Sequence, residues 1–425
     1  MKSEYLIIGG SAGGVGAIEA IREFDKVGPI TLISEEPYGP YSRPMISDFL
    51  AGIATFDKMQ YRPTNFWKNS KVKPLLGRRV IGVDFDNKSV VIEKNKKLYF
   101  EKLLIATGGK PIIPMIEGMN GKRVHTFTNL SDARIIKERL DEIKKVVVIG
   151  GGLIGVSVAE ALTKLNKMVT VVELKDKILN LIVDDVTSHV IEVAMKECGV
   201  EILTNNSVKK IVSKHHNEEK IEYVVLNDGR KILCDTVIIA IGVIPRIELL
   251  NSSGMDIKKG ILVDRYMSTN IPDVYACGDV SEGYDFVSEG NRVLALWPLA
   301  YQGGRIAGQN MAGSKIEYRG GTIMSALKYF DVPTISVGLV NPDNSKGEYE
   351  VLSSLDGKKG IYKKIVLRNN VICGMTLVGE VEKAGIYFNL IKEKIKLTKF
   401  KKNLFSPEFG LSYLPKSYSM KLLRS

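Results

Sequence analysis

The most constraining feature of this 425-residue sequence is a block that occurs twice: strand, glycine-rich turn, helix, strand and acid. In the first copy, an apolar strand at residues 5–8 runs directly into Gly-Gly-Ser-Ala-Gly-Gly at 9–14. A helix-compatible stretch follows at 15–24, and a β-branched strand at 30–34 ends on Glu35. This order predicts a dinucleotide-binding βαβ unit.

The second copy lies about 140 residues later and has the complete glycine pattern. A β-branched strand at residues 146–149 precedes Gly-Gly-Gly-Leu-Ile-Gly at 150–155. A helix-like run follows at 156–165, and the strand at 169–172 ends on Glu173. This copy predicts a second dinucleotide site.

The spacing of the glycines has a physical reason. The first permits a tight turn, the second lets the backbone approach a pyrophosphate, and the third lets helix and strand pack closely. The helix N-terminus offers unpaired N–H groups to the phosphates, and the acid accepts hydrogen bonds from ribose hydroxyls. The first copy departs from the pattern at its middle position, where Ser11 carries a Cβ.

After its βαβ unit, each copy continues with the same series of predicted strands. Strands typical of antiparallel sheets are predicted at residues 79–85, 89–93 and 97–101 in the first, and at 207–213, 221–226 and 231–233 in the second. Each then ends in a short apolar strand and a glycine, at 103–108 and 237–242, and Pro111 and Pro245 follow at the same offset. Two such matched series indicate an internal duplication with two dinucleotide sites.

A third block connects the duplication to a known family. Residues 269–279 read Thr-Asn-Ile-Pro-Asp-Val-Tyr-Ala-Cys-Gly-Asp, and residues 296–308 begin Leu-Trp-Pro-Leu-Ala-Tyr-Gln-Gly-Gly. With both glycine turns, roughly residues 3 to 390 resemble the two-dinucleotide-domain flavoproteins of the pyridine nucleotide-disulfide oxidoreductase superfamily. That group includes NADH oxidases, rubredoxin and ferredoxin reductases, coenzyme A disulfide reductases and the FAD domain of nitrite reductases.

The resemblance implies an α/β fold with two Rossmann-like domains, one inserted in the other, plus a small α+β C-terminal domain. The expected boundaries are residues 1–113 and 244–314 for an FAD domain, 114–243 for an NAD(H) domain, and 315–425 for a C-terminal interface or cap domain with a tail. Within that last part, strands are predicted at 334–340, 364–367 and 371–379 and a helix at 383–394.

The resemblance also implies which residues hold each cofactor. FAD is expected at Gly9, Ser11, Ala12, Gly13, Gly14, Glu35, Arg43, Pro44, Ala106, Thr107, Gly108, Gly278, Asp279, Trp297 and Pro298. The nicotinamide dinucleotide is expected at Gly150, Gly152, Leu153, Ile154, Gly155, Glu173, Ile241 and Gly242. Glu173 favours NADH over NADPH, because a carboxylate repels a 2′-phosphate. No metal site is expected.

Two departures from the family narrow the chemistry. Thiol-dependent relatives need a redox cysteine near the position of Ser42, but no cysteine precedes Cys198, and Cys277 is expected to be inert. Many relatives also carry a lysine and a glutamate that pair near the flavin, whereas the matching positions here are Asp48 and Ser157. Because hydride transfer mainly needs stacked rings, activity is not excluded.

Composition adds expectations about the setting and partners. The absence of a long apolar run or a leader-like segment argues against a membrane span, and four widely spaced cysteines favour the cytoplasm. The net charge of +12 reflects either a lysine-rich proteome or a docking surface for an acidic protein, with six lysines in residues 391–402. No nucleic-acid motif accompanies this charge, and a homodimer is expected.

The sequence thus predicts an FAD-dependent NADH oxidoreductase without a thiol relay. The catalytic chemistry belongs to the flavin rather than to a side chain, and the favoured acceptor is a small acidic carrier such as rubredoxin or ferredoxin. Two alternatives remain: an NADH oxidase that reduces oxygen directly, and an electron-delivering subunit of a nitrite reductase-type complex.

Overall fold

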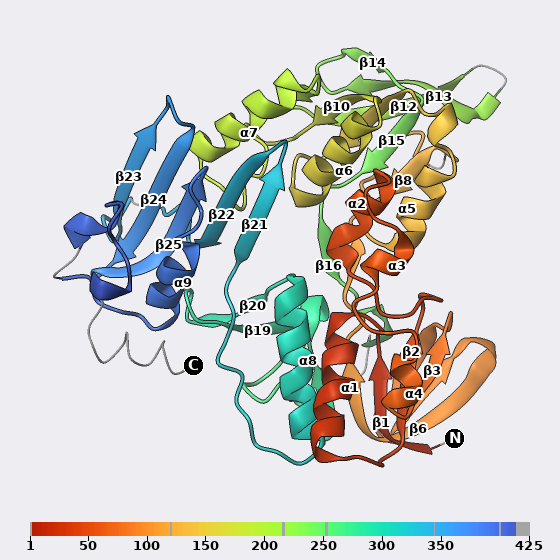
Figure 1. The fold of residues 1–425 in the computed structure, drawn as a ribbon. Helices are drawn as coiled ribbons and strands as arrows, with labels where there is room; N and C mark the ends of the chain where they lie inside the picture. Colours follow the sequence, from red (N-terminus) through yellow and green to blue (C-terminus); the bar gives the residue numbers. More distant parts are fainter. Residues whose placement is uncertain are drawn as a thin grey trace.

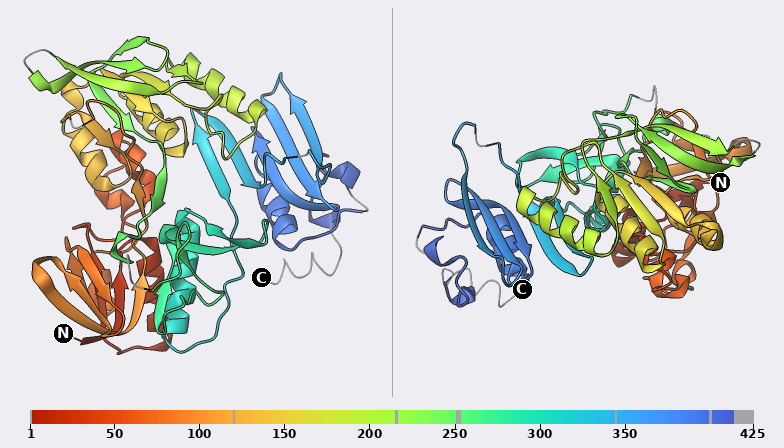
Figure 2. Two further views of the ribbon diagram at one scale, coloured as in Figure 1. Left: turned by 180° about the vertical axis from the view of Figure 1, so that it is seen from behind. Right: turned by 90° about the horizontal axis from the view of Figure 1, so that it is seen from above.

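The computed structural model describes residues 2–119, 121–214, 217–250, 254–343, 345–398 and 401–413. The chain forms three lobes, with the N-terminal lobe, the middle of the chain and the C-terminal sheet at separate corners of the molecule (Figure 1). Viewed from above, the C-terminal sheet stands to one side of the other two lobes (Figure 2). None of the helices in the described part of the chain has the length and apolarity needed to cross a membrane.

The first lobe contains a parallel sheet with the strand order β3-β2-β1-β6-β18. Its strands are β1 (Lys2–Ile8), β2 (Ile30–Ser34), β3 (Val72–Leu76), β6 (Lys96–Ile105) and β18 (Val274–Ala276). Helices α1 (Ala12–Phe24) and α8 (Trp297–Met311) pack closely against each other on one side of it (Figure 1). The core of this lobe is therefore built from two segments that are far apart in the sequence, one beginning at Lys2 and one ending at Met311.

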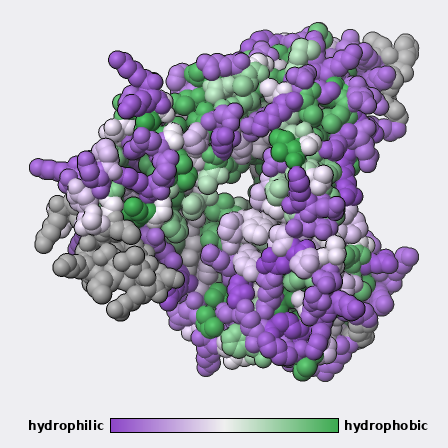
Figure 3. Space-filling model, viewed as in Figure 1, coloured by the Kyte–Doolittle hydropathy of each residue, from purple (hydrophilic) through white to green (hydrophobic). Residues whose placement is uncertain are grey.

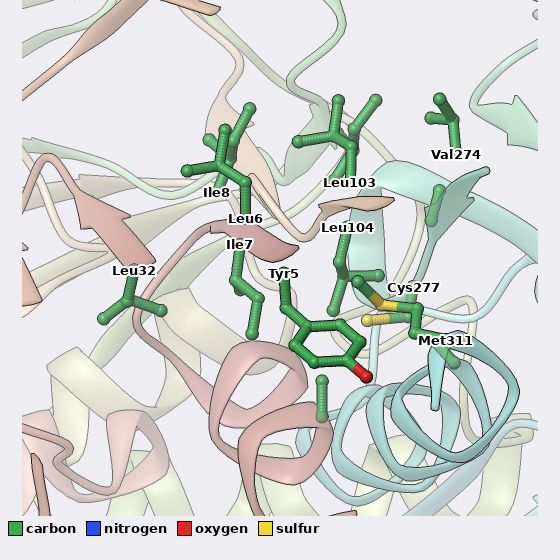
Figure 4. Close-up of a cluster of buried hydrophobic side chains, with 14 of the residues drawn as sticks. Tyr5, Leu6, Ile7, Ile8, Leu32, Leu103, Leu104, Val274, Cys277 and Met311 are labelled. Carbon is green, nitrogen blue, oxygen red and sulfur yellow. The ribbon is translucent and has the colours of Figure 1, made fainter. Parts of the chain in front are cut away.

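The β-branched and aliphatic runs predicted as strands are buried because helices or loops cover the sheet. In β1, side chains alternate between the two faces: Tyr5 and Ile7 point toward the helices, and Leu6 and Ile8 point the opposite way (Figure 4). Each of these four is at most 5% exposed. Such burial on both faces explains the continuous apolar run in the sequence.

The second lobe repeats the first. Its parallel sheet has the order β11-β10-β9-β15-β8, which places equivalent strands at equivalent positions. The strands are β8 (Val124–Thr126), β9 (Lys145–Ile149), β10 (Met168–Val172), β11 (Glu201–Leu203) and β15 (Thr236–Ile239). The helices are α5 (Leu130–Lys137), α6 (Leu153–Lys164) and α7 (Asp185–Glu197). The fold confirms the predicted pair of Rossmann-like units.

The antiparallel appendages differ between the two units. In the first, β4 (Val80–Asp84) and β5 (Ser89–Ile92) join β6 directly. The sequence suggested separate strands at residues 97–101 and 103–108, but β6 is one strand that pairs with β5 and with the parallel strands in a single sheet. In the second unit, β12 (Val208–Lys214), β13 (Asn217–Leu226) and β14 (Lys231–Leu233) form a sheet of their own.

Two connections join the first and second lobes. Strands β7 (Gly109–Pro111) and β16 (Val243–Pro245) run antiparallel to each other, so the chain crosses into the second lobe and returns at one place. The second lobe is therefore inserted into the first, as the fold prediction states. The short helices α2 (Ile46–Leu50), α3 (Phe56–Met59) and α4 (Phe66–Asn69) follow the first βαβ unit, and Leu50 and Met59 are buried in the core of the second lobe.

The C-terminal lobe is an antiparallel sheet with the order β21-β22-β25-β24-β23. Its strands are β21 (Met324–Tyr329), β22 (Val332–Gly338), β23 (Glu350–Asp356), β24 (Ile361–Arg368) and β25 (Val371–Val378), and α9 (Ala384–Lys392) packs on one face. The predicted helix and three strands correspond to α9, β22, β24 and β25, whereas β21 and β23 had no clear pattern. Residues 414–425 of the tail lie outside the described residues.

The smaller strands β17 (Ile261–Leu262), β19 (Ser281–Asp285) and β20 (Gly290–Val293) bridge the first lobe and the C-terminal sheet. On the other side, the C-terminal sheet contacts the second lobe through a buried polar cluster. The Tyr362 hydroxyl donates to Asp184 Oδ2 at 2.6 Å, and Lys364 Nζ lies 3.1 Å from the same oxygen. Because Asp184 also caps α7, one carboxylate ties the helix to the sheet.

Candidate functional site

The three lobes enclose one continuous cleft of about 2400 Å³. Figure 3 shows its mouth as the hollow at the centre of the face, with green and white groups on part of its rim. Both glycine turns open into this cleft, and the C-terminal lobe contributes one wall. We call each glycine turn with the helix that follows it a cradle: residues 9–14 and α1 form the first, and residues 150–155 and α6 form the second. A cleft of this size, shared by two such cradles, has room for two dinucleotides.

The structure brings the residues predicted from the sequence together. All of them line the cleft except two glycines, Gly14 and Gly155. Those from the first and third blocks are Gly9, Ser11, Ala12, Gly13, Glu35, Arg43, Pro44, Ala106, Thr107, Gly108, Gly278, Asp279, Trp297 and Pro298. Those from the second block are Gly150, Gly152, Leu153, Ile154, Glu173, Ile241 and Gly242.

The two exceptions serve helix packing. A Cβ on Gly14 would lie 2.0 Å from the carbonyl oxygen of Gly9, and one on Gly155 would lie 1.9 Å from that of Gly150. Each helix can therefore approach its strand only because these positions lack a side chain. Gly9 and Gly150 have φ values of 120° and 106°, which favour glycine.

The serine at position 11 is compatible with the protein backbone. Ser11 and its counterpart Gly152 each cap a helix in an extended conformation, with φ values of −89° and −79°. A Cβ on Gly152 would meet no atom within 4 Å. The middle glycine is therefore dispensable for the turn itself, and the first cradle keeps its shape with serine.

The helix N-termini at both cradles suit an anion. The first turns of α1 and α6 contain no acidic residue, and residues of both glycine turns line the cleft. Unpaired N–H groups and the positive end of the helix dipole together stabilise phosphate. Both glycine turns therefore fit the pyrophosphate of a dinucleotide.

The acid after each second strand is held differently. Glu35 forms an ion pair with Arg246, and Arg79 lies 3.9 Å away. Glu173 instead accepts hydrogen bonds from the backbone, at 2.6 Å from Gly151 N and 2.8 Å from Lys175 N. Both carboxylates keep lone pairs for ribose hydroxyls, and Arg246 is a cleft residue that no sequence pattern indicated.

Arg43 occupies the wall between the cradles. It forms an ion pair with Glu36 and donates to the Thr128 carbonyl oxygen at 3.3 Å. Burial alone would lower the pKa of its guanidinium, but the charges of Glu36, Tyr41 and Asp279 raise it. A fixed cation therefore faces the cleft near Asp279, whose own pKa is raised by burial.

The start of α8 completes the first cradle. Trp297 is the first residue of the helix, lines the cleft, and has a buried Nε1 atom without a hydrogen-bond partner. The first turn carries no acid and includes Pro298, which has no N–H group of its own. An orphaned donor and a helix N-terminus beside Asp279 fit the flavin end of FAD, where negative charge develops on reduction.

The thiol of Cys277, the cysteine nearest the first cradle, is not placed for redox chemistry. Cys277 is 1% exposed and packs beneath Gly13, where burial and then the nearby Asp279 charge raise its pKa to about 12. At neutral pH such a thiol is protonated and a poor nucleophile. Among the described residues, no group of three or more His, Cys, Asp or Glu is placed to hold a metal ion.

The C-terminal lobe contacts the second cradle, which the sequence did not reveal. The Tyr329 hydroxyl donates to the Leu153 carbonyl oxygen at 3.1 Å, and Phe330 N donates to Glu160 Oε1 at 3.1 Å. The hairpin between β21 and β22 thereby rests on α6 and closes the cleft from one side. These contacts join residues about 170 positions apart, so no local pattern could indicate them.

Comparisons with known proteins agree with this geometry. A family model described as pyridine nucleotide-disulphide oxidoreductase matches residues 3–304, and one described as rubredoxin NAD+ reductase C-terminal domain matches residues 324–395. The chain is 28% identical to a nitrite reductase [NAD(P)H] of Bacillus subtilis (strain 168), over 94% of this chain but only 48% of that protein. It therefore spans about half the length of that relative.

Two further matches extend over most of this chain. An NADH-dependent phenylglyoxylate dehydrogenase subunit epsilon of Aromatoleum evansii is 30% identical over 93% of both chains. The solved structure of a NAD-dependent persulfide reductase from A. fulgidus aligns with a TM-score of 0.86 and 28% identity, over 93% of this chain and 77% of the other. With the family match, these likenesses support FAD and a nicotinamide dinucleotide as the cofactors of this chain.

A single family model thus accounts for both glycine cradles, the Gly278-Asp279 motif and the start of α8. The chain is an NAD(P)H-dependent flavoprotein oxidoreductase, and it belongs to the pyridine nucleotide-disulphide oxidoreductase family.

Proposed function

We propose that the N-terminal cradle holds FAD and the second cradle holds NADH, and that hydride passes between them inside the shared cleft. The observation that carries this proposal is the opening of both glycine turns into one cleft. Asp279 and the start of α8 border the first cradle, which makes it the better fit for the longer, permanently bound FAD. When bound, FAD accepts hydride and can release electrons one at a time.

The chain's own residues bind the two dinucleotides and orient them. The N–H groups of α1 and α6 hold the pyrophosphates, while Glu35 and Glu173 accept hydrogen bonds from adenosine ribose hydroxyls. Arg43, fixed by Glu36, supplies positive charge beside Asp279. The Tyr329 contact holds the start of α6 against the C-terminal lobe and limits water access to the cleft.

NADH rather than NADPH is the proposed donor. The Glu173 carboxylate is fixed by two backbone N–H groups at the place where a ribose would sit. A 2′-phosphate would meet this negative charge at close range. The Lys175 side chain is exposed, so solvent and salt screen its charge and it offsets little of that repulsion.

The proposed acceptor is a small acidic electron-carrier protein such as a rubredoxin or ferredoxin. The buried thiol of Cys277 and the serine at position 42 leave no thiol relay, and the C-terminal lobe matches the rubredoxin reductase model. Net charge is +12, although two lysines of the basic stretch, Lys394 and Lys401, are paired with acids. Lys392 and Lys396 remain exposed for docking.

A second candidate is an electron-delivering subunit of a larger enzyme complex. The observation favouring it is the end-to-end match with the subunit epsilon of an NADH-dependent phenylglyoxylate dehydrogenase. In that case the same cleft would reduce a partner subunit instead of a free carrier. A cytoplasmic homodimer remains our proposal for the setting, consistent with four cysteines that form no disulfide.

The test is NADH oxidation by the purified protein with rubredoxin, with ferredoxin, or with oxygen alone. We expect a carrier to raise turnover and the gain to shrink as salt increases, because opposite charges steer encounter. In the double variant Lys392→Glu/Lys396→Glu, the carrier should no longer raise turnover. In the control Lys209→Glu, which changes an exposed lysine of β12 in the second lobe, the carrier should still raise it. Equal turnover with and without carriers, matched by oxygen consumption, would instead identify an oxidase. Negligible turnover with a co-purifying partner would identify a subunit.

A further inference from the structure

Asp48 is a carboxylate that the proposed binding roles do not use. It lies in α2, lines the central cleft, and is partly buried. Among the residues that the structure describes, no hydrogen bond or ion pair satisfies its side chain. An unpaired carboxylate in a partly dry cleft is unfavourable by itself, so a ligand is expected to balance its charge.

The position of Asp48 places it between the two cradles. Helix α2 follows Arg43 and Pro44 directly and packs against α6. Glu173 marks the adenosine end of the second cradle, so the other end of the dinucleotide must run along α6 toward the first cradle. The next cleft-lining residues of α6 are Ser157 and Glu160, and α6 packs against α2. A nicotinamide ring that reaches FAD therefore passes Asp48.

Most other charges near α2 are paired with an opposite charge; the exception is Lys137 of α5, whose Nζ donates to the Phe49 carbonyl oxygen at 2.5 Å. Glu160 pairs with Lys164 at 2.9 Å and accepts the Phe330 N–H. Lys328, on the β21 wall, pairs with Asp331 at 2.9 Å. Arg43 is paired with Glu36. Ser157 is neutral, so among the described cleft residues of α2 and α6 Asp48 is the charged side chain without an ion-pair partner.

We propose that Asp48 determines which redox state of the nicotinamide binds more tightly, by favouring the cationic oxidised ring over the neutral reduced ring. This inference rests on the proposed function. The hydride that leaves C4 of NADH carries two electrons and one hydrogen nucleus to FAD, and the ring it leaves gains one positive charge. A fixed carboxylate beside the ring stabilises that developing charge without needing to reorganise.

The experiment compares two ligands on the FAD-loaded protein by calorimetry. One is NAD+, whose ring is cationic; the other is 1,4,5,6-tetrahydro-NAD, whose ring is neutral and cannot donate hydride. In Asp48→Asn, we expect NAD+ to bind about tenfold more weakly, the effect of one charge roughly 6 Å away in a medium of dielectric about 40. Binding of the neutral analogue should stay within about twofold, since its ring carries no charge to lose.

Two control variants test whether the charge of Asp48 causes the difference in affinity. Asp48→Glu keeps the charge and should keep the ratio of the two affinities. Asp57→Asn removes an exposed carboxylate from neighbouring α3, outside the cleft, and should leave the ratio unchanged. If Asp48→Asn weakens both ligands equally or neither, the inference is wrong while the proposed function stands. If the wild-type protein binds neither ligand, the proposed function fails and the inference falls with it.

Discussion

Replacing the third glycine of the second cradle should abolish nicotinamide binding while leaving FAD in place. In Gly155→Ala, the new Cβ would lie 1.9 Å from the Gly150 carbonyl oxygen, where ordinary contact begins at 3.4 Å. Helix α6 must therefore move away from β9 by about 1.5 Å, the difference between those two distances. Overpacking of this kind costs about 1–3 kcal/mol of stability.

The effect on binding should exceed the effect on stability. A misplacement of about 1 Å in a preorganised site can cost about 100-fold, and here the displaced group is the helix N-terminus that holds the pyrophosphate. We expect the Kd for NADH to rise by about that factor. The flavin absorbance and the FAD content should remain at wild-type levels, because the first cradle lies in the other lobe.

The matched control is Gly152→Ala, at the N-cap of α6 and three residues before Gly155. Its Cβ would meet no protein atom within 4 Å, so folding and stability should be unchanged. Any loss of NADH affinity would then come from contact with the ligand. Gly14→Ala is the reciprocal variant and should lose FAD, because its Cβ would lie 2.0 Å from the Gly9 oxygen. Loss of FAD from Gly155→Ala, with NADH binding intact, would refute the assignment of the cradles.

Three further predictions concern other groups. Glu173→Gln keeps an acceptor for the Gly151 N–H but removes the negative charge. The preference for NADH over NADPH, measured as the ratio of kcat/KM values, should therefore fall about tenfold. An unchanged preference would show that Glu173 does not select the cofactor. Cys277→Ala should leave carrier reduction intact in steady-state assays, because a thiol with a pKa near 12 is protonated; loss of turnover without loss of FAD would restore a thiol role. Asp184→Ala should destabilise the protein by about 3–5 kcal/mol, because it leaves Lys364 buried without its partner.

Asp184→Ala should also change how the stability of the protein depends on pH. Burial would raise the pKa of Asp184, but the hydrogen bonds from Tyr362 and Thr187 and the Lys364 charge lower it overall. Its contribution to stability is therefore present above the unfolded pKa of about 3.9 and is lost as pH falls through the lower folded value. Thermal midpoints measured against pH should show a smaller acid-side decline in Asp184→Ala than in wild type. Parallel curves would contradict this reasoning.

The sequence predicted the elements that have local patterns. The duplicated strand–glycine–helix–strand blocks identified both cradles because periodicity and glycine spacing are set within about 30 residues. Strand β21 escaped prediction because residues 324–329 read Met-Ser-Ala-Leu-Lys-Tyr, without a turn signal or clean alternation. The two predicted strands that became β6 looked separate because Lys102 interrupts the apolar run, although its backbone continues the ladder.

What the sequence could not reveal are contacts between distant segments. Tyr41 follows the first βαβ unit, yet its hydroxyl accepts a hydrogen bond from Leu130 N at the start of α5 in the second lobe. Arg246 reaches Glu35 across 211 positions. Such pairs have no period and depend on how the lobes meet. The resemblance to a family supplied the cofactor roles, which geometry alone would have left open.

The central claim is that one cleft passes hydride from NADH to FAD. The most direct measurement is an anaerobic titration of the purified protein with NADH, following the flavin absorbance near 450 nm. The account predicts about one FAD per chain and loss of the band with one equivalent of NADH, with a slower single-turnover rate when C4 carries deuterium. A protein that carries FAD but keeps its full absorbance in excess NADH would contradict it.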